Sequence, residues 1–82
     1  MAVYKFHVMN DTFYTVDEVG KELPGLDSAR AHAQRIAADI IHDELSQGRD
    51  HIHLSIVVEN ACGHRVASFR STTSIELGEE GA

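Results

Sequence analysis

This 82-residue chain has three histidines whose spacing could allow their side chains to bind one metal ion. His51 and His53 are two residues apart in an alternating segment, so on a β-strand their rings point to the same face. His7 lies in another alternating segment and joins them if the two strands are neighbours. Three neutral imidazoles with an open fourth position are a known zinc arrangement. The candidate zinc site is therefore His7, His51 and His53, and the alternative is solvated histidines on an exposed strand.

Two further groups could do chemistry, and each also has a simpler explanation. Cys62 precedes His64 in an expected turn, where its thiol could react as a thiolate, although an incidental exposed thiol is the alternative. Asp39, His42 and Asp43 share a helix face, where a carboxylate could orient the imidazole as a general base. No oxyanion-stabilising group accompanies them, so a solvated helix face is the simpler interpretation.

The composition excludes several classes of protein. The 13 acidic residues outnumber the 7 lysines and arginines, giving a formal charge of -6, whereas nucleic-acid binders carry a basic stripe. No apolar run approaches the ~20 residues that cross a membrane. Cys62 is the lone cysteine and can form no internal disulfide, and the N-terminus does not resemble a signal peptide. We therefore expect a cytoplasmic protein that binds neither nucleic acid nor membranes.

The periodicity of the apolar residues predicts an α+β fold of order β-β-α-β-β. The expected elements are strands at 3–9 and 12–16, a loop at 17–25, a helix at 27–47, and strands at 51–59 and 65–70. Asp27 is the expected N-cap of the helix, because its carboxylate can accept the free N–H groups of the first turn. Apolar residues recur along this helix at three- and four-residue steps and form one stripe.

One long helix can cover only one face of the expected four-stranded, mainly antiparallel sheet. We expect the strands in the order second, first, third, fourth, with residues 1–70 as a single domain. Residues 71–82 form an acidic, frayed tail, in which Ile75 and Leu77 could add a short strand. The uncovered face is then solvated, paired with a second copy or used in binding. It carries Lys5, His7, His51, His53, Ser55, Val57 and Glu59.

Short motifs resemble a family of small, uncharacterised bacterial proteins that is catalogued as a domain of unknown function. The motifs are Phe6-His7-Val8 in the first strand and Asp17-x-x-Gly20-x-Glu22-Leu23-Pro24 before the helix. The spacing of Ala29 and Ala33 and the apolar positions of the last hairpin also match. The resemblance implies a single α+β domain in which His7 and the loop from Asp17 to Gly20 belong to a shared pattern. It implies no activity.

The leading hypothesis is a non-enzymatic interaction module that forms a homo-oligomer, with a dimer as the first expectation, through its free sheet face or an edge strand. The small core and the uncovered face are its basis, since association stabilises small domains that lack disulfides. The alternative is a histidine-dependent metal-binding protein or enzyme, with zinc as its only expected cofactor. A regulatory protein that binds an unknown protein partner is a third possibility.

Overall fold

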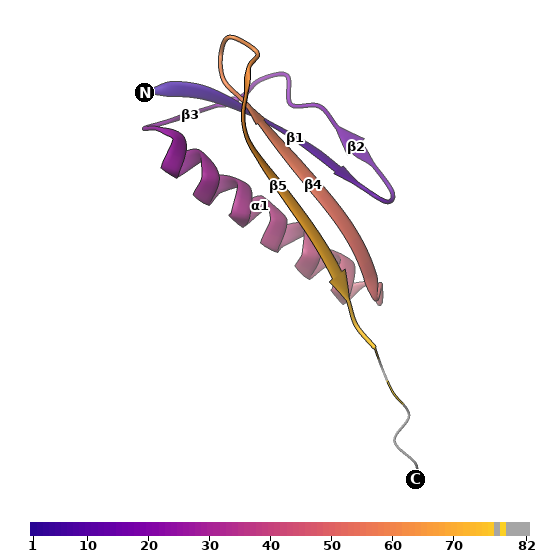
Figure 1. The fold of residues 1–82 in the computed structure, drawn as a ribbon. Coiled ribbons are helices and arrows are strands. Elements are labelled where there is room, and N and C mark those ends of the chain that lie inside the picture. The colour runs from indigo at the N-terminus through magenta and orange to yellow at the C-terminus, as the bar shows by residue number, and fades with distance from the viewer. Residues whose placement is uncertain (77, 79–82) are drawn as a thin grey trace.

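The computed structural model describes residues 1–76 and 78, which form an antiparallel sheet with one helix along one face (Figure 1). The elements are β1 (Ala2–Asn10), β2 (Tyr14–Thr15), β3 (Lys21–Leu23), α1 (Leu26–Ser46), β4 (His51–Glu59) and β5 (Arg65–Ser74). The predicted α+β class is confirmed, as is the antiparallel sheet with a single helix. No helix in the described part of the chain is long and apolar enough to cross a membrane.

The sheet has five strands, one more than the sequence predicts. The order β2-β1-β4-β5 is the one expected for the four predicted strands. β3 adds to the first half of β1, with Ala2 opposite Leu23 and Tyr4 opposite Lys21. The prediction of a loop throughout 17–25 is therefore wrong at β3. β3 has three residues, and only Leu23 is half-buried. So short a segment has no alternating pattern that would distinguish a strand from a loop.

β5 also differs from expectation, because it continues four residues beyond the predicted end at residue 70. Its last residues pair with the first residues of β4, with Ser74 opposite His51. The N–H of Ile75 then donates to the carbonyl of Asp50 at 2.9 Å, which continues the ladder by one step. The first four residues of the expected tail thus belong to the sheet, whereas Leu77 and residues 79–82 lie outside the described residues.

The helix starts earlier than expected. Gly25 is the N-cap, with an extended backbone and no side-chain cap, and its carbonyl accepts the N–H of Ala29 at 3.1 Å. The prediction of Asp27 as N-cap is therefore wrong; Asp27 lies in the first turn, where its charge favours the positive end of the helix dipole. At the other end Gly48 takes a φ of 86°, which a residue with a Cβ rarely adopts.

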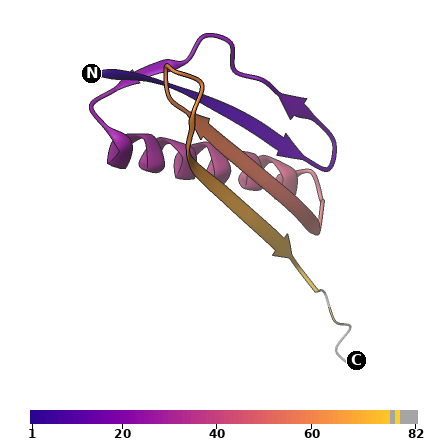
Figure 2. The ribbon, with the colours of Figure 1, turned by 45° about the horizontal axis from the view of Figure 1, so that its top comes forward.

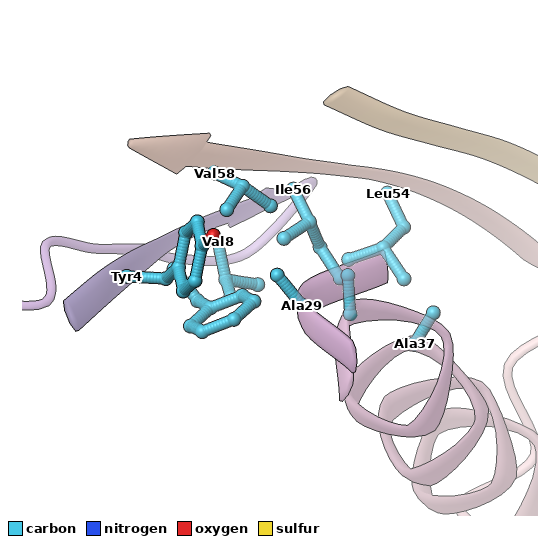
Figure 3. Packing of buried hydrophobic residues seen from close by; sticks show 9 residues of the cluster. Tyr4, Val8, Ala29, Ala37, Leu54, Ile56 and Val58 are labelled. Atoms are coloured by element: carbon cyan, nitrogen blue, oxygen red, sulfur yellow. The ribbon is translucent and has the colours of Figure 1, made fainter. Parts of the chain in front are cut away.

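The core lies between α1 and the two central strands (Figure 3). Ala29, Ala33 and Ala37 are the buried residues of the helix, and their small side chains let it approach the sheet closely. The predicted inward faces of both strands are confirmed, because alternation with a period of two assigns each residue to a face. Those buried strand residues are Tyr4, Phe6, Val8, Ile52, Leu54, Ile56 and Val58.

Candidate functional site

Residues of the motifs Phe6-His7-Val8 and Asp17-x-x-Gly20 meet at a gap in the outer edge of β1. β2 pairs with Val8 and Met9, and β3 pairs with the first residues of β1, so neither strand reaches Phe6. The N–H of Phe6 instead donates to Oδ2 of Asp17 at 3.1 Å. The carboxylate of Asp17 therefore serves as a hydrogen-bond acceptor where a neighbouring strand would otherwise supply a carbonyl.

The second carboxylate oxygen of Asp17 closes a turn. Oδ1 accepts the N–H of Val19 at 3.1 Å and that of Gly20 at 2.9 Å. Gly20 has a φ of 81°, and a Cβ there would lie 2.7 Å from Cγ1 of Val3, so the turn requires glycine. Burial raises the pKa of Asp17, but the three donated N–H groups and His7 outweigh it, so that the pKa lies below its ordinary value.

Both ring nitrogens of His7 have partners. Nδ1 accepts the backbone N–H of Asp17 at 3.1 Å, which places the proton of the neutral ring on Nε2. Nε2 lies 2.5 Å from Oε1 of Glu59, on the neighbouring strand β4. The His7 side chain is only 12% exposed. We call His7, Asp17, Gly20 and Glu59 the Asp17 clasp, because together they bind the loop before α1 to β1 and β4.

His32 extends the clasp toward the helix, although no motif in the sequence indicates a function for it. Its ring packs edge-on against Phe6, with centroids 4.7 Å apart. Burial, followed by the charges of Lys21 and Arg35, lowers the pKa of His32 below its ordinary value, although Asp17 acts in the opposite direction. Its spacing of three residues from Ala29 was a usable signal, because it places His32 at the border of the apolar stripe.

The structure brings together two of the three predicted metal ligands. The rings of His51 and His53 lie 4.8 Å apart on the open face of β4. His7, however, is opposite Val57, which lies four residues from His53, or about 13 Å along the strand. Among the described residues there is no group of three His, Cys, Asp or Glu side chains that could hold a metal ion.

The other candidate groups are exposed. Cys62 is a free cysteine in the turn between β4 and β5, where Oδ1 of Asn60 accepts its N–H at 3.0 Å. On the helix, Nδ1 of His42 lies 3.7 Å from Oδ1 of Asp43, with both side chains more than 70% exposed. This exposure fits an incidental thiol in a turn and a solvated helix face. None of the hydrogen bonds and ion pairs of these two groups within the described residues joins a general base to a nucleophile.

Two of the surface hollows in the described part of the chain could admit small apolar groups. One, of about 260 Å³, lies on the open sheet face, and the other, of about 240 Å³, is a groove between α1 and β5 on the opposite face. The open-face hollow is lined by His7, Met9, Tyr14, Ser55, Val57, Glu59 and Arg65. The groove is lined by Arg30, Ala33, Gln34, Val58, Ala67, Ser68 and Phe69. Both hollows are wide and largely apolar with a charged side chain at the rim, as in contact surfaces between proteins.

The outer edge of β5 is a further candidate binding surface. β4 covers one edge of this strand, and within the described residues no strand pairs with the other edge (Figure 2). β5 is ten residues long and has no proline. It therefore presents a long row of backbone N–H and C=O groups that another strand could bind. The sequence predicts association through the free sheet face or an edge strand without indicating which edge, and it predicts a shorter strand here than the structure has.

The fold and the clasp define a small α+β protein whose motif residues join a loop to a sheet. The chain belongs to the family described as Domain of unknown function (DUF6894), whose model matches residues 3–72. The resemblance to a family of unknown function is thereby confirmed. No curated protein and no solved structure matches the chain.

Proposed function

We propose that this protein is a non-enzymatic interaction module of the bacterial cytoplasm, which associates with a second copy of itself through the outer edge of β5. The observation that supports this function is the length of the free edge. Natural edge strands are commonly very short or are interrupted by proline or bulges. β2 fits that description with two residues, whereas β5 has ten and a register shift only near its start.

The hydrogen bond of Ile75 defines which backbone groups of β5 face outward. Because the N–H of Ile75 donates to Asp50, these two residues form a hydrogen-bonded pair. Hydrogen-bonded pairs alternate along an antiparallel ladder, so every second residue of β5 directs its N–H and C=O toward β4. The residues between them direct these groups toward the free edge: Ser68, Arg70, Thr72 and Ser74.

The small core is a second reason for association. An 82-residue chain buries only about 60–65% of its unfolded surface, and this one has a single cysteine and hence no internal disulfide. Pairing of two free edges extends the sheet and satisfies backbone groups of both copies. The single cysteine is also the basis for proposing a reducing cytoplasm.

Sedimentation velocity at micromolar concentration tests this function. We expect a species of twice the 9.0 kDa chain mass. Thr72→Pro should shift it toward the monomer, because Thr72 directs its N–H to the free edge and proline has none. Thr72→Val keeps the N–H and is the matched control. A wild-type protein that sediments as a 9.0 kDa monomer throughout would contradict the proposal.

The alternative function is metal binding by histidine, and the observation in its favour is the proximity of the His51 and His53 rings. A metal ion that binds the folded protein raises its melting temperature by mass action. Zinc at a hundredfold molar excess should therefore stabilise the protein if the histidines bind it. His53→Ala should abolish that effect, and His42→Ala, an exposed helix histidine, is the control. An unchanged melting temperature of the wild type would remove this alternative.

A further inference from the structure

We infer the geometry of the proposed self-association: two β5 strands pair antiparallel around a two-fold axis at Ser71, and Ile75 of each copy enters the groove between β5 and α1 of the other. This inference rests on the proposed function and adds the register and the occupant of the groove. It follows from the outward backbone groups, from the charges along β5 and from one exposed apolar side chain.

The outward residues restrict the possible registers. A two-fold pairing through hydrogen-bonded pairs matches outward residues with each other, and an axis at Ser71 is the one that pairs all four of them; axes at Phe69, Arg70, Thr72 or Thr73 pair fewer. An axis at Arg70 places two like charges directly opposite, which is destabilising. An axis at Ser71 instead places Arg70 opposite Thr72 and Ser68 opposite Ser74. An axis at Thr72 shortens the overlap of the two strands.

The groove between α1 and β5 provides a reason to choose Ser71. Ile75 is 41% exposed, and the alternation of β5 directs its side chain to the helix side of the sheet, with Ala67 and Phe69. With the axis at Ser71, Ile75 of one copy lies opposite Ala67 of the other. Ala67 lines the groove of about 240 Å³ together with Ala33, and these small side chains leave room for an isoleucine.

The charges at the two ends of β5 are complementary in the same register. Arg65 lies at the start of the strand, opposite Glu59 of β4, and Glu76 follows its end. Because the Glu59 carboxylate contacts His7, the guanidinium of Arg65 can bind a carboxylate of the other copy. Antiparallel pairing around Ser71 places Glu76 of one copy opposite Val66 and hence beside Arg65 of the other. Such rim charges favour the correct register more than they add affinity.

Disulfide cross-linking tests the axis directly. In a Cys62→Ser background, single cysteines are introduced at Arg70, Ser71 and Thr72, and each protein is oxidised mildly and analysed without reductant. Only a residue on the two-fold axis lies opposite the same residue of the other protomer. With the axis at Ser71, the two Ser71 Cα atoms would lie about 4.5 Å apart, within the range of a disulfide. We expect Ser71→Cys to form a covalent dimer and the other two variants to form little.

The outcomes separate this inference from the proposed function. Dominant cross-linking at Arg70 or Thr72, or a dimer in sedimentation with no cross-link at any of the three positions, overturns the register; self-association survives in both cases. A monomer overturns the proposed function and the inference together.

Two variants test the groove and the charges. Ile75→Ala should weaken the dimer roughly tenfold, as expected for losing most of the apolar area that one isoleucine buries on association. Val19→Ala, which removes an 87% exposed valine far from β5, is the control and should leave it unchanged. Arg65→Glu should weaken the dimer, and adding Glu76→Arg should restore it. An Ile75→Ala dimer as tight as that of Val19→Ala, or the absence of rescue, would overturn this placement.

Discussion

Replacement of Asp17 by alanine is the most informative test of the clasp. The change removes the acceptor of three backbone N–H groups, those of Phe6, Val19 and Gly20. Val19 is exposed, so water can replace the carboxylate there, whereas the bonds from Phe6 and Gly20 are partly buried. A buried donor left without an acceptor costs about 1–3 kcal/mol. We therefore expect Asp17→Ala to lower the free energy of unfolding by about 2–4 kcal/mol.

This loss is large for a domain of this size, since natural domains are stable by only about 5–15 kcal/mol. Urea unfolding at neutral pH, followed by circular dichroism, should show a lower midpoint with an unchanged slope. Glu18→Ala removes the exposed neighbouring carboxylate, and its effect should stay within about 0.5 kcal/mol. If Asp17→Ala unfolds at the same urea concentration as Glu18→Ala, the carboxylate does not hold the loop to β1 and the clasp as described is wrong.

Three further predictions concern the same region. Because the folded pKa of Asp17 lies below the ordinary 3.8, its stabilisation is present above that pH and lost as the pH falls further; Asp17→Asn should flatten the stability profile measured there. The lowered pKa of His32 means that stability falls as the pH drops below the ordinary 6.5, and His32→Leu should remove that slope in thermal melts. Gly20→Ala should cost about 2 kcal/mol or more, because it adds a contact with Val3 to an unfavourable φ. Gly48→Ala has the same φ problem but open space, so equal losses for the two variants in urea unfolding would contradict the steric explanation.

The sequence predicted most reliably the features that depend on a single period. Alternation in the segments of β1 and β4 correctly assigned their inward faces, because adjacent residues of a strand point to opposite sides. The three-and-four spacing likewise predicted α1 to within one residue at each end. The short strand β3 and the last four residues of β5 were missed, because a few polar or small residues carry no periodic signal and join the sheet through backbone bonds alone.

The contacts of the candidate site residues could not be predicted from the sequence, because these contacts depend on the register of the strands. The notion of a site formed by His7, His51 and His53 required the strands to align these residues, and the pairing instead places His7 opposite Val57. The resemblance places both His7 and Asp17 in one pattern, but nothing in the sequence shows that Asp17 reaches the gap between β2 and β3. That gap exists only because two short strands divide the edge of β1 between them.

The two edges of the sheet differ in how far other parts of the chain cover them, and this difference supports the proposed association. On the β1 side, a two-residue strand, a three-residue strand and the Asp17 carboxylate together cover the edge. An edge covered in this way offers few free backbone groups to another chain. On the opposite side, the ten residues of β5 have no comparable cover among the described residues, and Ile75 lies exposed at the end of the strand. Among the described residues, the β1 edge is covered and the longer β5 edge is not, and this difference favours the proposed partner strand at β5.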